Sequence, residues 1–109
     1  MTYVFDLDGT LCETAGRSYV SATPYPQRIA YVNALHREGH TIIIDTARGS
    51  LTGEDWEHAT YEQLVSWGLQ FDELRTGKKI HADVYVDDKA TRDTDFFEGC
   101  DADTKTDEE

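Results

Sequence analysis

Two aspartates, Asp6 and Asp8, are the residues of this sequence whose type and spacing point most directly to chemistry. One apolar residue, Leu7, separates them, and Gly9 follows, which permits a sharp turn of the backbone. Two carboxylates held close together repel each other unless a proton or a cation joins them. Mg²⁺ suits such a pair because it takes oxygen ligands and usually keeps several waters. One carboxylate can also attack phosphorus as a nucleophile while the other transfers protons.

Phosphoryl transfer also needs donors to the phosphoryl oxygens, over which the charge of the transition state spreads. Thr46 offers a hydroxyl and a backbone N–H directly after the second apolar run of the chain. Lys78 or Lys79 offers a cation shortly before a later apolar run. We therefore assign Thr46, Ala47 and one of these lysines to the binding of substrate phosphate.

Three further charged residues have more than one interpretation. Arg48 could bind substrate phosphate through its planar guanidinium, or it could pair with surface acids, and both alternatives stay open. Asp88 could add a third carboxylate to a metal site formed with Asp6 and Asp8. Asp87 is the second choice for that ligand, because one member of an acidic pair could instead brace the lysine.

Periodic patterns predict the elements that must position these residues. Apolar runs predict strands over residues 2–6, 41–45 and 83–86, with a weaker candidate over residues 71–74. Helical spacing predicts helices over residues 26–39, 54–67 and 90–97, and residues 11–25 are expected to form a loop or flap. Strands that alternate with helices indicate an α/β fold with a mainly parallel sheet.

The polar residues converge once the strands are aligned. The predicted strands end at Asp6, at Asp45 and Thr46, and at Asp87 and Asp88. Ligands of parallel sheets bind beyond the carboxyl ends of the strands. We therefore expect all three polar groups to meet at one edge of the sheet.

Residues 5–11, Phe-Asp-Leu-Asp-Gly-Thr-Leu, resemble the signature motif of the haloacid dehalogenase-like (HAD) superfamily. The later motifs of that superfamily follow in order, with Thr46 as the Ser/Thr, Lys78 as the lysine, and Asp87 and Asp88 as the acidic pair. The resemblance extends from residue 2 to about residue 97.

This resemblance implies a Rossmann-like three-layer sandwich and a Mg²⁺-dependent reaction. It further implies an aspartyl-phosphate intermediate on Asp6, with Asp8 as general acid and base. Asp8 is then expected to bind the metal only through its backbone carbonyl. Of the two segments that could hold a cap domain, residues 11–25 are too few, and residues 49–77 are mostly one helix and a strand of the core. The resemblance is therefore to the minimal, capless type. Such an open site would accept a large substrate or borrow a lid from another subunit, which makes a homo-oligomer one of the alternatives.

A closer resemblance is to small HAD phosphatases of bacterial capsule and surface-polysaccharide gene clusters. It is carried by Thr46-Ala47-Arg48-Gly49, by Gly77-Lys78 and by residues 85–90. Those phosphatases commonly have proline after the motif lysine, where this chain has Lys79. Lys78 is therefore the first choice for the motif lysine and Lys79 its substitute.

Three functions follow as hypotheses. The first is a Mg²⁺-dependent phosphomonoester hydrolase acting on a small sugar or polyol phosphate. The second is a polynucleotide 3′-phosphatase, which the net charge of −12 disfavours because nucleic-acid binding needs a basic face. The third is a phosphoacceptor or interaction module without turnover, which the DxD spacing disfavours.

Length and composition limit the organisation of the chain. Its 109 residues suit one domain, which we assign to residues 1–97, followed by an acidic tail over residues 98–109 that we expect to be disordered. No apolar stretch is long enough to span a membrane. The start of the chain has no basic segment typical of a signal peptide, and the two cysteines lack CxxC spacing. We therefore expect a cytoplasmic protein with free thiols.

Overall fold

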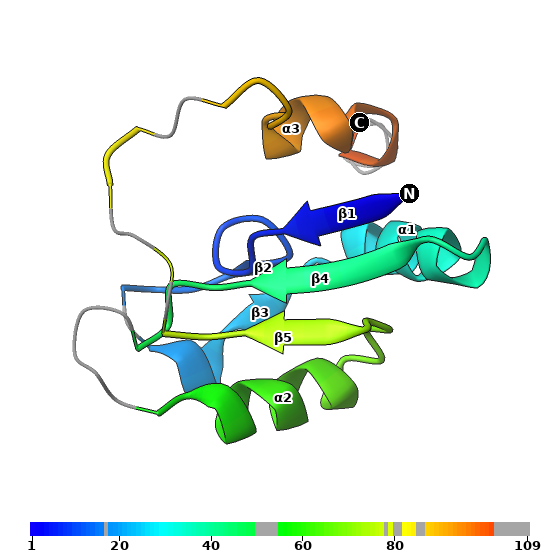
Figure 1. The fold of residues 1–109 in the computed structure, drawn as a ribbon. Helices are drawn as coiled ribbons and strands as arrows, with labels where there is room; N and C mark the ends of the chain where they lie inside the picture. The colour runs from blue at the N-terminus through cyan, green and yellow to red at the C-terminus, as the bar shows by residue number, and fades with distance from the viewer. Residues whose placement is uncertain (17, 50–54, 78, 80–81, 85–86, 102–109) are drawn as a thin grey trace, which may run out of the picture.

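The computed structural model describes residues 1–16, 18–49, 55–77, 79, 82–84 and 87–101 (Figure 1). A parallel sheet of three strands holds the fold together, in the order β1 (Thr2–Phe5), β4 (Thr41–Asp45) and β5 (Glu73–Arg75). The central strand β4 pairs on both sides, and its Ile42 and Ile44 are fully buried. The predicted strands over residues 2–6 and 41–45 are confirmed, and the weaker candidate over residues 71–74 overlaps β5, which begins two residues later and ends one residue later.

The predicted strand over residues 83–86 differs from the structure. Asp83 and Val84 are not in a strand, and Val84 is 73% exposed. Residues 85 and 86 lie outside the described part of the chain. A short apolar run favours a strand only where its side chains can be buried, and Val84 is not buried here.

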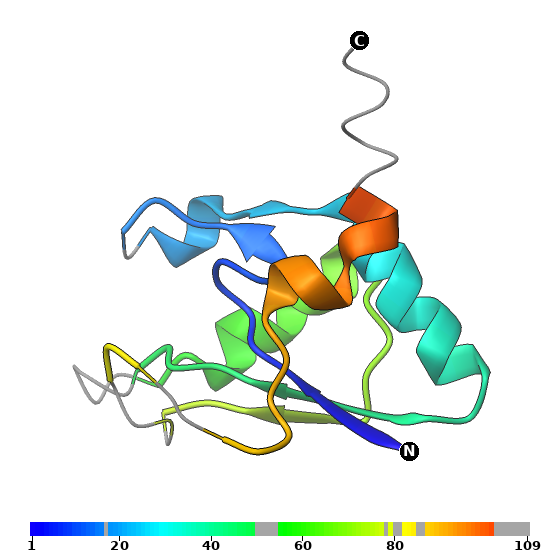
Figure 2. The same cartoon turned by 90° about the horizontal axis from the view of Figure 1, so that it is seen from above.

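Two helices connect the strands of the sheet. Helix α1 (Pro26–Arg37) begins with Pro26 in its first turn, where the missing N–H costs no hydrogen bond. It ends before Gly39, whose φ of 95° is accessible mainly to glycine. Helix α2 (Glu57–Ser66) follows β4 and leads into β5. Both helices were predicted, and both lie on the same side of the sheet (Figure 2). The α/β class is therefore confirmed, whereas the three-layer HAD core stays a prediction.

The predicted loop or flap is a small ribbon in the structure. Its two antiparallel strands are β2 (Cys12–Glu13) and β3 (Thr23–Pro24), and a short 3₁₀ helix, η1 (Tyr19–Ser21), lies between them. We call residues 12–24 the flap. The flap leaves the turn after β1 and returns to the start of α1, so both of its ends are fixed by the core.

The core lies between the sheet, α1, α2 and the C-terminal helix. Apolar side chains from the strands meet those of the helices there, because each element is apolar along one face. Its buried members include Phe5, Leu7, Leu11, Ile29, Val32, Ile42, Ile44, Leu64, Leu69 and Phe97. No helix in the described part of the chain is long and apolar enough to span a membrane.

The C-terminal end of the fold differs from the prediction. Helix α3 (Asp93–Phe96) is followed by helical residues 98–101, which had been assigned to a disordered tail. Arg28, only 8% exposed, donates from Nη1 to Asp93 Oδ2 at 2.8 Å and from Nε to Asp101 Oδ1 at 3.1 Å. Its guanidinium also lies 4.8 Å from the ring centre of Phe97. The folded part of the chain therefore extends through Asp101, and residues 102–109 lie outside the described residues.

We expect Asp101→Asn to lower the free energy of unfolding by about 1–3 kcal/mol, because Arg28 would lose one of its two charged partners inside the protein. Urea unfolding measures this difference. Asp95→Asn is the matched control, since Asp95 is exposed in the same segment, and it should change stability by no more than about 0.5 kcal/mol. Equal stability of the two variants would contradict the role of Asp101 as an anchor.

Candidate functional site

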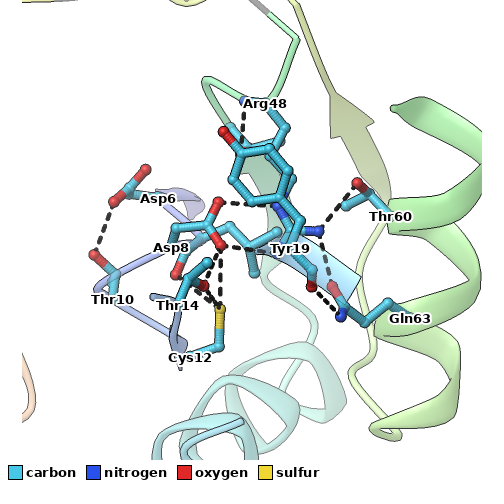
Figure 3. A network of polar contacts seen from close by, with 11 residues as sticks. Asp6, Asp8, Thr10, Cys12, Thr14, Tyr19, Arg48, Thr60 and Gln63 are labelled. Carbon is cyan, nitrogen blue, oxygen red and sulfur yellow. Dashed lines mark hydrogen bonds and ion pairs between the residues drawn. The ribbon is translucent and has the colours of Figure 1, made fainter. Parts of the chain in front are cut away.

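Asp6 is the first residue beyond β1 and faces the open side of the site. Its side chain is 40% exposed. Thr10 donates its hydroxyl to Oδ2 at 3.1 Å, and the Lys79 ammonium lies 2.9 Å from Oδ1. Figure 3 shows the Asp6 carboxylate turned toward Thr10 and away from Arg48. The expected carboxylate therefore lies at the strand end, with a hydroxyl and a cation beside it.

The turn after β1 separates the two aspartates. Leu7 points into the core and is fully buried. Its carbonyl accepts hydrogen bonds from the N–H groups of Thr10 at 3.0 Å and Leu11 at 2.8 Å. Gly9 adopts a φ of 87° and donates its N–H to the carbonyl of Cys12 at 2.8 Å. This closed turn sends the side chains of Asp6 and Asp8 in different directions (Figure 3).

Asp8 is bound on both carboxylate oxygens by a buried arginine. Arg48 donates from Nε to Oδ2 at 2.9 Å and from Nη2 to Oδ1 at 2.8 Å. The Arg48 side chain is 2% exposed and that of Asp8 is 25% exposed. Two parallel hydrogen bonds of this kind fix the carboxylate in direction as well as in distance.

The guanidinium of Arg48 is held in turn by α2 and the flap (Figure 3). Its Nη1 donates to Gln63 Oε1 at 2.8 Å and to the Thr60 hydroxyl at 3.2 Å. The ring of Tyr19 covers it, with 4.7 Å between the guanidinium carbon and the ring centre. Gln63 Nε2 donates to the carbonyl of Tyr19 at 2.7 Å. The guanidinium of Arg48 is therefore enclosed by Asp8, by two residues of α2 and by the ring of Tyr19.

The environment of Asp8 favours its ionised form. Burial alone would raise its pKa, but hydrogen bonds from Arg48 and from Thr14, whose hydroxyl is 2.6 Å from Oδ1, outweigh that effect. The pKa of the Asp8 carboxyl therefore lies below its ordinary value. Burial raises the pKa of the neighbouring Cys12 thiol, which contacts Asp8 Oδ1 at 3.6 Å and stays protonated at neutral pH.

The residues assigned to phosphate binding are only partly assembled. Thr46 is 1% exposed, and its hydroxyl accepts a hydrogen bond from the N–H of Arg48 at 3.2 Å. Ala47 is exposed beside it. Arg48 was expected either to bind phosphate or to pair with surface acids. In the structure it pairs with an acid, and that acid is the partly buried Asp8. Phosphate contacts of Thr46 and Ala47 stay predictions.

The expected lysine and acidic pair have different outcomes. Lys78 lies outside the described residues, and its substitute Lys79 makes the contact with Asp6. Asp87 and Asp88 are exposed, and Asp87 Oδ1 accepts a hydrogen bond from the N–H of Lys89 at 2.7 Å. Residues 83 and 84 are not in a strand and residues 85 and 86 lie outside the described part of the chain, so Asp88 as a metal ligand, with Asp87 as second choice, stays a prediction.

The donor set fits Mg²⁺ only in part. Within the described ranges, no group of three or more His, Cys, Asp or Glu side chains is arranged to hold a metal ion. Asp6 offers an accessible carboxylate, which is a suitable oxygen ligand. The carboxylate of Asp8 is engaged by Arg48 and Thr14, which leaves its backbone carbonyl as the donor that it could offer. Asp88 as the third ligand stays a prediction.

Several residues of the site were missed by the sequence analysis. Tyr19 and Thr14 come from the flap, and Thr60 and Gln63 come from α2. Thr60 and Gln63 are three residues apart, so they share a helix face with the buried Leu64. Two polar residues on the apolar face of a helix were the available signal that this face meets a buried polar group.

Comparison with known proteins supports the overall fold of the chain. No family model matches the chain, and no curated protein matches it. The crystal structure of a target protein from Vibrio cholerae is similar, with a TM-score of 0.74 and 27% sequence identity. The similarity covers 97% of this chain and 98% of the Vibrio cholerae chain, so the two are similar in overall fold.

We expect Asp8→Asn to lower the free energy of unfolding at neutral pH by about 2–3 kcal/mol, below the ~3–5 kcal/mol of a fully buried pair, because it removes the charge opposite Arg48. The folded-state pKa of Asp8 is depressed, so its stabilising effect is present above about pH 4 and is lost at lower pH.

Urea unfolding from about pH 6 to about pH 3 measures this effect, and the difference between the wild-type chain and Asp8→Asn should shrink as the pH falls. Asp95→Asn controls for the change in net charge, since Asp95 is exposed. A difference that stays constant or grows toward low pH would contradict the pairing.

Proposed function

We propose that this chain is a phosphomonoester hydrolase in which Asp6 is the nucleophile and Asp8 transfers protons. The observation that carries the proposal is the divergence of the two carboxylates. Asp6 is accessible and lies beside a lysine and a hydroxyl, whereas Asp8 is anchored from behind by Arg48. A nucleophile must reach the substrate, and a proton-transfer group must be held at a fixed direction near it.

In the first step, an Asp6 carboxylate oxygen attacks phosphorus and the bond from phosphorus to the ester oxygen breaks. The alcohol oxygen leaves with the electron pair of that bond and takes a proton from the carboxylic-acid form of Asp8, which is the minority form at neutral pH because Arg48 and Thr14 favour the carboxylate. The product of this step is an acyl-phosphate on Asp6. Dividing hydrolysis in this way replaces one difficult step by two easier ones.

In the second step, a water molecule attacks the phosphorus of the acyl-phosphate. Asp8 accepts a proton from that water, the bond between phosphorus and Asp6 breaks, and inorganic phosphate leaves. The carboxylate form of Asp8, which Arg48 and Thr14 favour, is the form that this step needs. The chain then returns to its starting state.

Lys79 has the charge that the reaction requires beside Asp6. Its ammonium is 2.9 Å from Asp6 Oδ1, and its side chain is 23% exposed. A cation at this point offsets repulsion between the Asp6 carboxylate and the anionic phosphoryl group. We therefore assign to Lys79 the role for which the sequence analysis preferred Lys78.

The proposed metal and substrate class are based on the resemblance of residues 5–11 to the HAD signature motif. Mg²⁺ would be held by the Asp6 carboxylate, the Asp8 carbonyl and Asp88, with Asp87 as the second choice, and when bound it would neutralise phosphoryl charge. The chain would then be a minimal HAD core without a cap, located in the cytoplasm. Its short flap leaves the site open, and the net charge of −12 favours a small sugar or polyol phosphate over nucleic acid.

Phosphate release from p-nitrophenyl phosphate and from a panel of phosphosugars, polyol phosphates, nucleotides and 3′-phosphorylated DNA, with Mg²⁺, tests the proposal. We expect turnover, and Asp6→Asn should lower it by at least about 10³-fold, because the substitution removes the nucleophile. Asp95→Asn, at a distant exposed carboxylate, should leave turnover unchanged.

The outcomes of this assay are distinct. Turnover no higher than that of Asp6→Asn on every substrate would overturn the proposal. A long-lived phosphorylated Asp6 without phosphate release would indicate a phosphoacceptor module instead. Activity confined to phosphorylated DNA ends would retain the chemistry and replace the substrate class.

A further inference from the structure

We propose that Arg48 is a positioning residue that holds Asp8 in its working direction, and that this hold depends on docking of the flap (residues 12–24). The catalytic consequence of this inference rests on the proposed function, whereas the mechanical linkage does not. Arg48 then has a role other than phosphate binding, and the flap helps to fix the orientation of the Asp8 carboxylate.

Arg48 is closed to a substrate by its burial and its contacts with protein groups. Its Nε and Nη2 are directed at the two oxygens of Asp8, and its Nη1 at Thr60 and Gln63. The side chain is 2% exposed. An arginine that recognises substrate phosphate must present one edge of its fork to the open site, and here both donor edges are used by protein groups.

Groups from helix α2 and from the flap keep Arg48 in this position. Helix α2 supplies the two acceptors for Nη1, Thr60 Oγ1 and Gln63 Oε1. The flap supplies the ring of Tyr19, which lies 4.7 Å from the guanidinium carbon and shields it from water. Tyr19 is itself supported by the indole of Trp56, at 5.0 Å between ring centres. Arg48 is thus clamped between one helix and the flap.

The flap is joined to Asp8 directly through Cys12 and Thr14, and indirectly through Tyr19. Near its start, Thr14 donates to Asp8 Oδ1 at 2.6 Å. At η1, the carbonyl of Tyr19 accepts a hydrogen bond from Gln63 Nε2 at 2.7 Å, and Gln63 Oε1 binds Arg48. If the flap moved away, Asp8 would lose Thr14 and Arg48 would lose its cover. The direction of the Asp8 carboxylate therefore depends on flap docking.

Arg48→Lys tests the positioning role, because lysine retains the charge and loses the two-pronged contact. We expect kcat to fall by at least about 10-fold, as small displacements of a reacting group do. KM and the inhibition constant of inorganic phosphate should change by less than about twofold, because Arg48 does not touch the phosphoryl group. Asp101→Asn is the matched control for loss of stability at a buried arginine, and it should keep the wild-type kcat.

Two results would overturn the positioning role. A rise in the phosphate inhibition constant of Arg48→Lys in step with the loss of activity would make Arg48 a phosphate-binding residue. If kcat fell equally in Asp101→Asn, the effect of Arg48→Lys would be explained by a general loss of stability.

A measurement without substrate tests the linkage and separates it from the proposed function. In Gln63→Leu, backbone amides of the flap should exchange hydrogen at least about 10-fold faster than in the wild-type chain, since docked segments owe their protection to such contacts. Gln70→Leu, at an exposed position just beyond α2, is the matched control and should leave flap exchange unchanged. Unchanged exchange in Gln63→Leu would overturn the linkage even in an active enzyme. A wild-type chain without turnover but with this exchange pattern would overturn only the proposed function.

Discussion

The ion pair between Arg48 and Asp8 is the interaction on which the arrangement of the site depends. A guanidinium that is 2% exposed is stable inside a protein only if its charge is paired and hydrogen-bonded, because an unpaired buried charge costs several kcal/mol. Here the donors reach Asp8, Thr60 and Gln63, and among the described residues no buried side-chain nitrogen or oxygen lacks a partner. The turn after β1, the end of β4 and helix α2 must therefore all be in place at once.

This constraint explains why two aspartates of the same turn have different surroundings. Asp8 is drawn inward to the buried arginine, and the closed turn around Gly9 leaves Asp6 on the open side. Asp6 is consequently balanced by Lys79, a partly exposed cation that could also face a substrate. One carboxylate is fixed and the other accessible, which is the division of labour that a two-step phosphoryl transfer requires.

Local patterns in the sequence predict the elements well, because apolar periodicity and glycine positions are local properties. The strand over Thr41–Asp45 and the helix after Pro26 follow directly from them. Partner choice between distant residues does not follow. Arg48 and Asp8 are 40 positions apart, and Arg28 and Asp101 are 73 positions apart, so only the folded chain decides these pairs.

The candidate site shows the same limit. Asp6 and Asp8 were predicted because the DxD spacing is contained in one short segment. The sequence could not decide between Lys78 and Lys79, since the path of the backbone selects the lysine that meets Asp6. Nor could a short apolar run at residues 83–86 establish that a strand would carry Asp88 to the site. Pairing with the rest of the sheet decides whether such a segment becomes a strand.

The distinct roles of the two aspartates can be measured by trapping the intermediate. The chain would be mixed with a turned-over phosphate ester, quenched with acid and treated with borohydride, which reduces an acyl-phosphate to an alcohol and so converts aspartate to homoserine. Mass spectrometry of the peptides then locates the modified residue. Homoserine at position 6, with Asp8 intact, is the predicted result. Homoserine at position 8, or phosphate release with neither residue modified under the same conditions, would contradict the assignment of Asp6 as nucleophile.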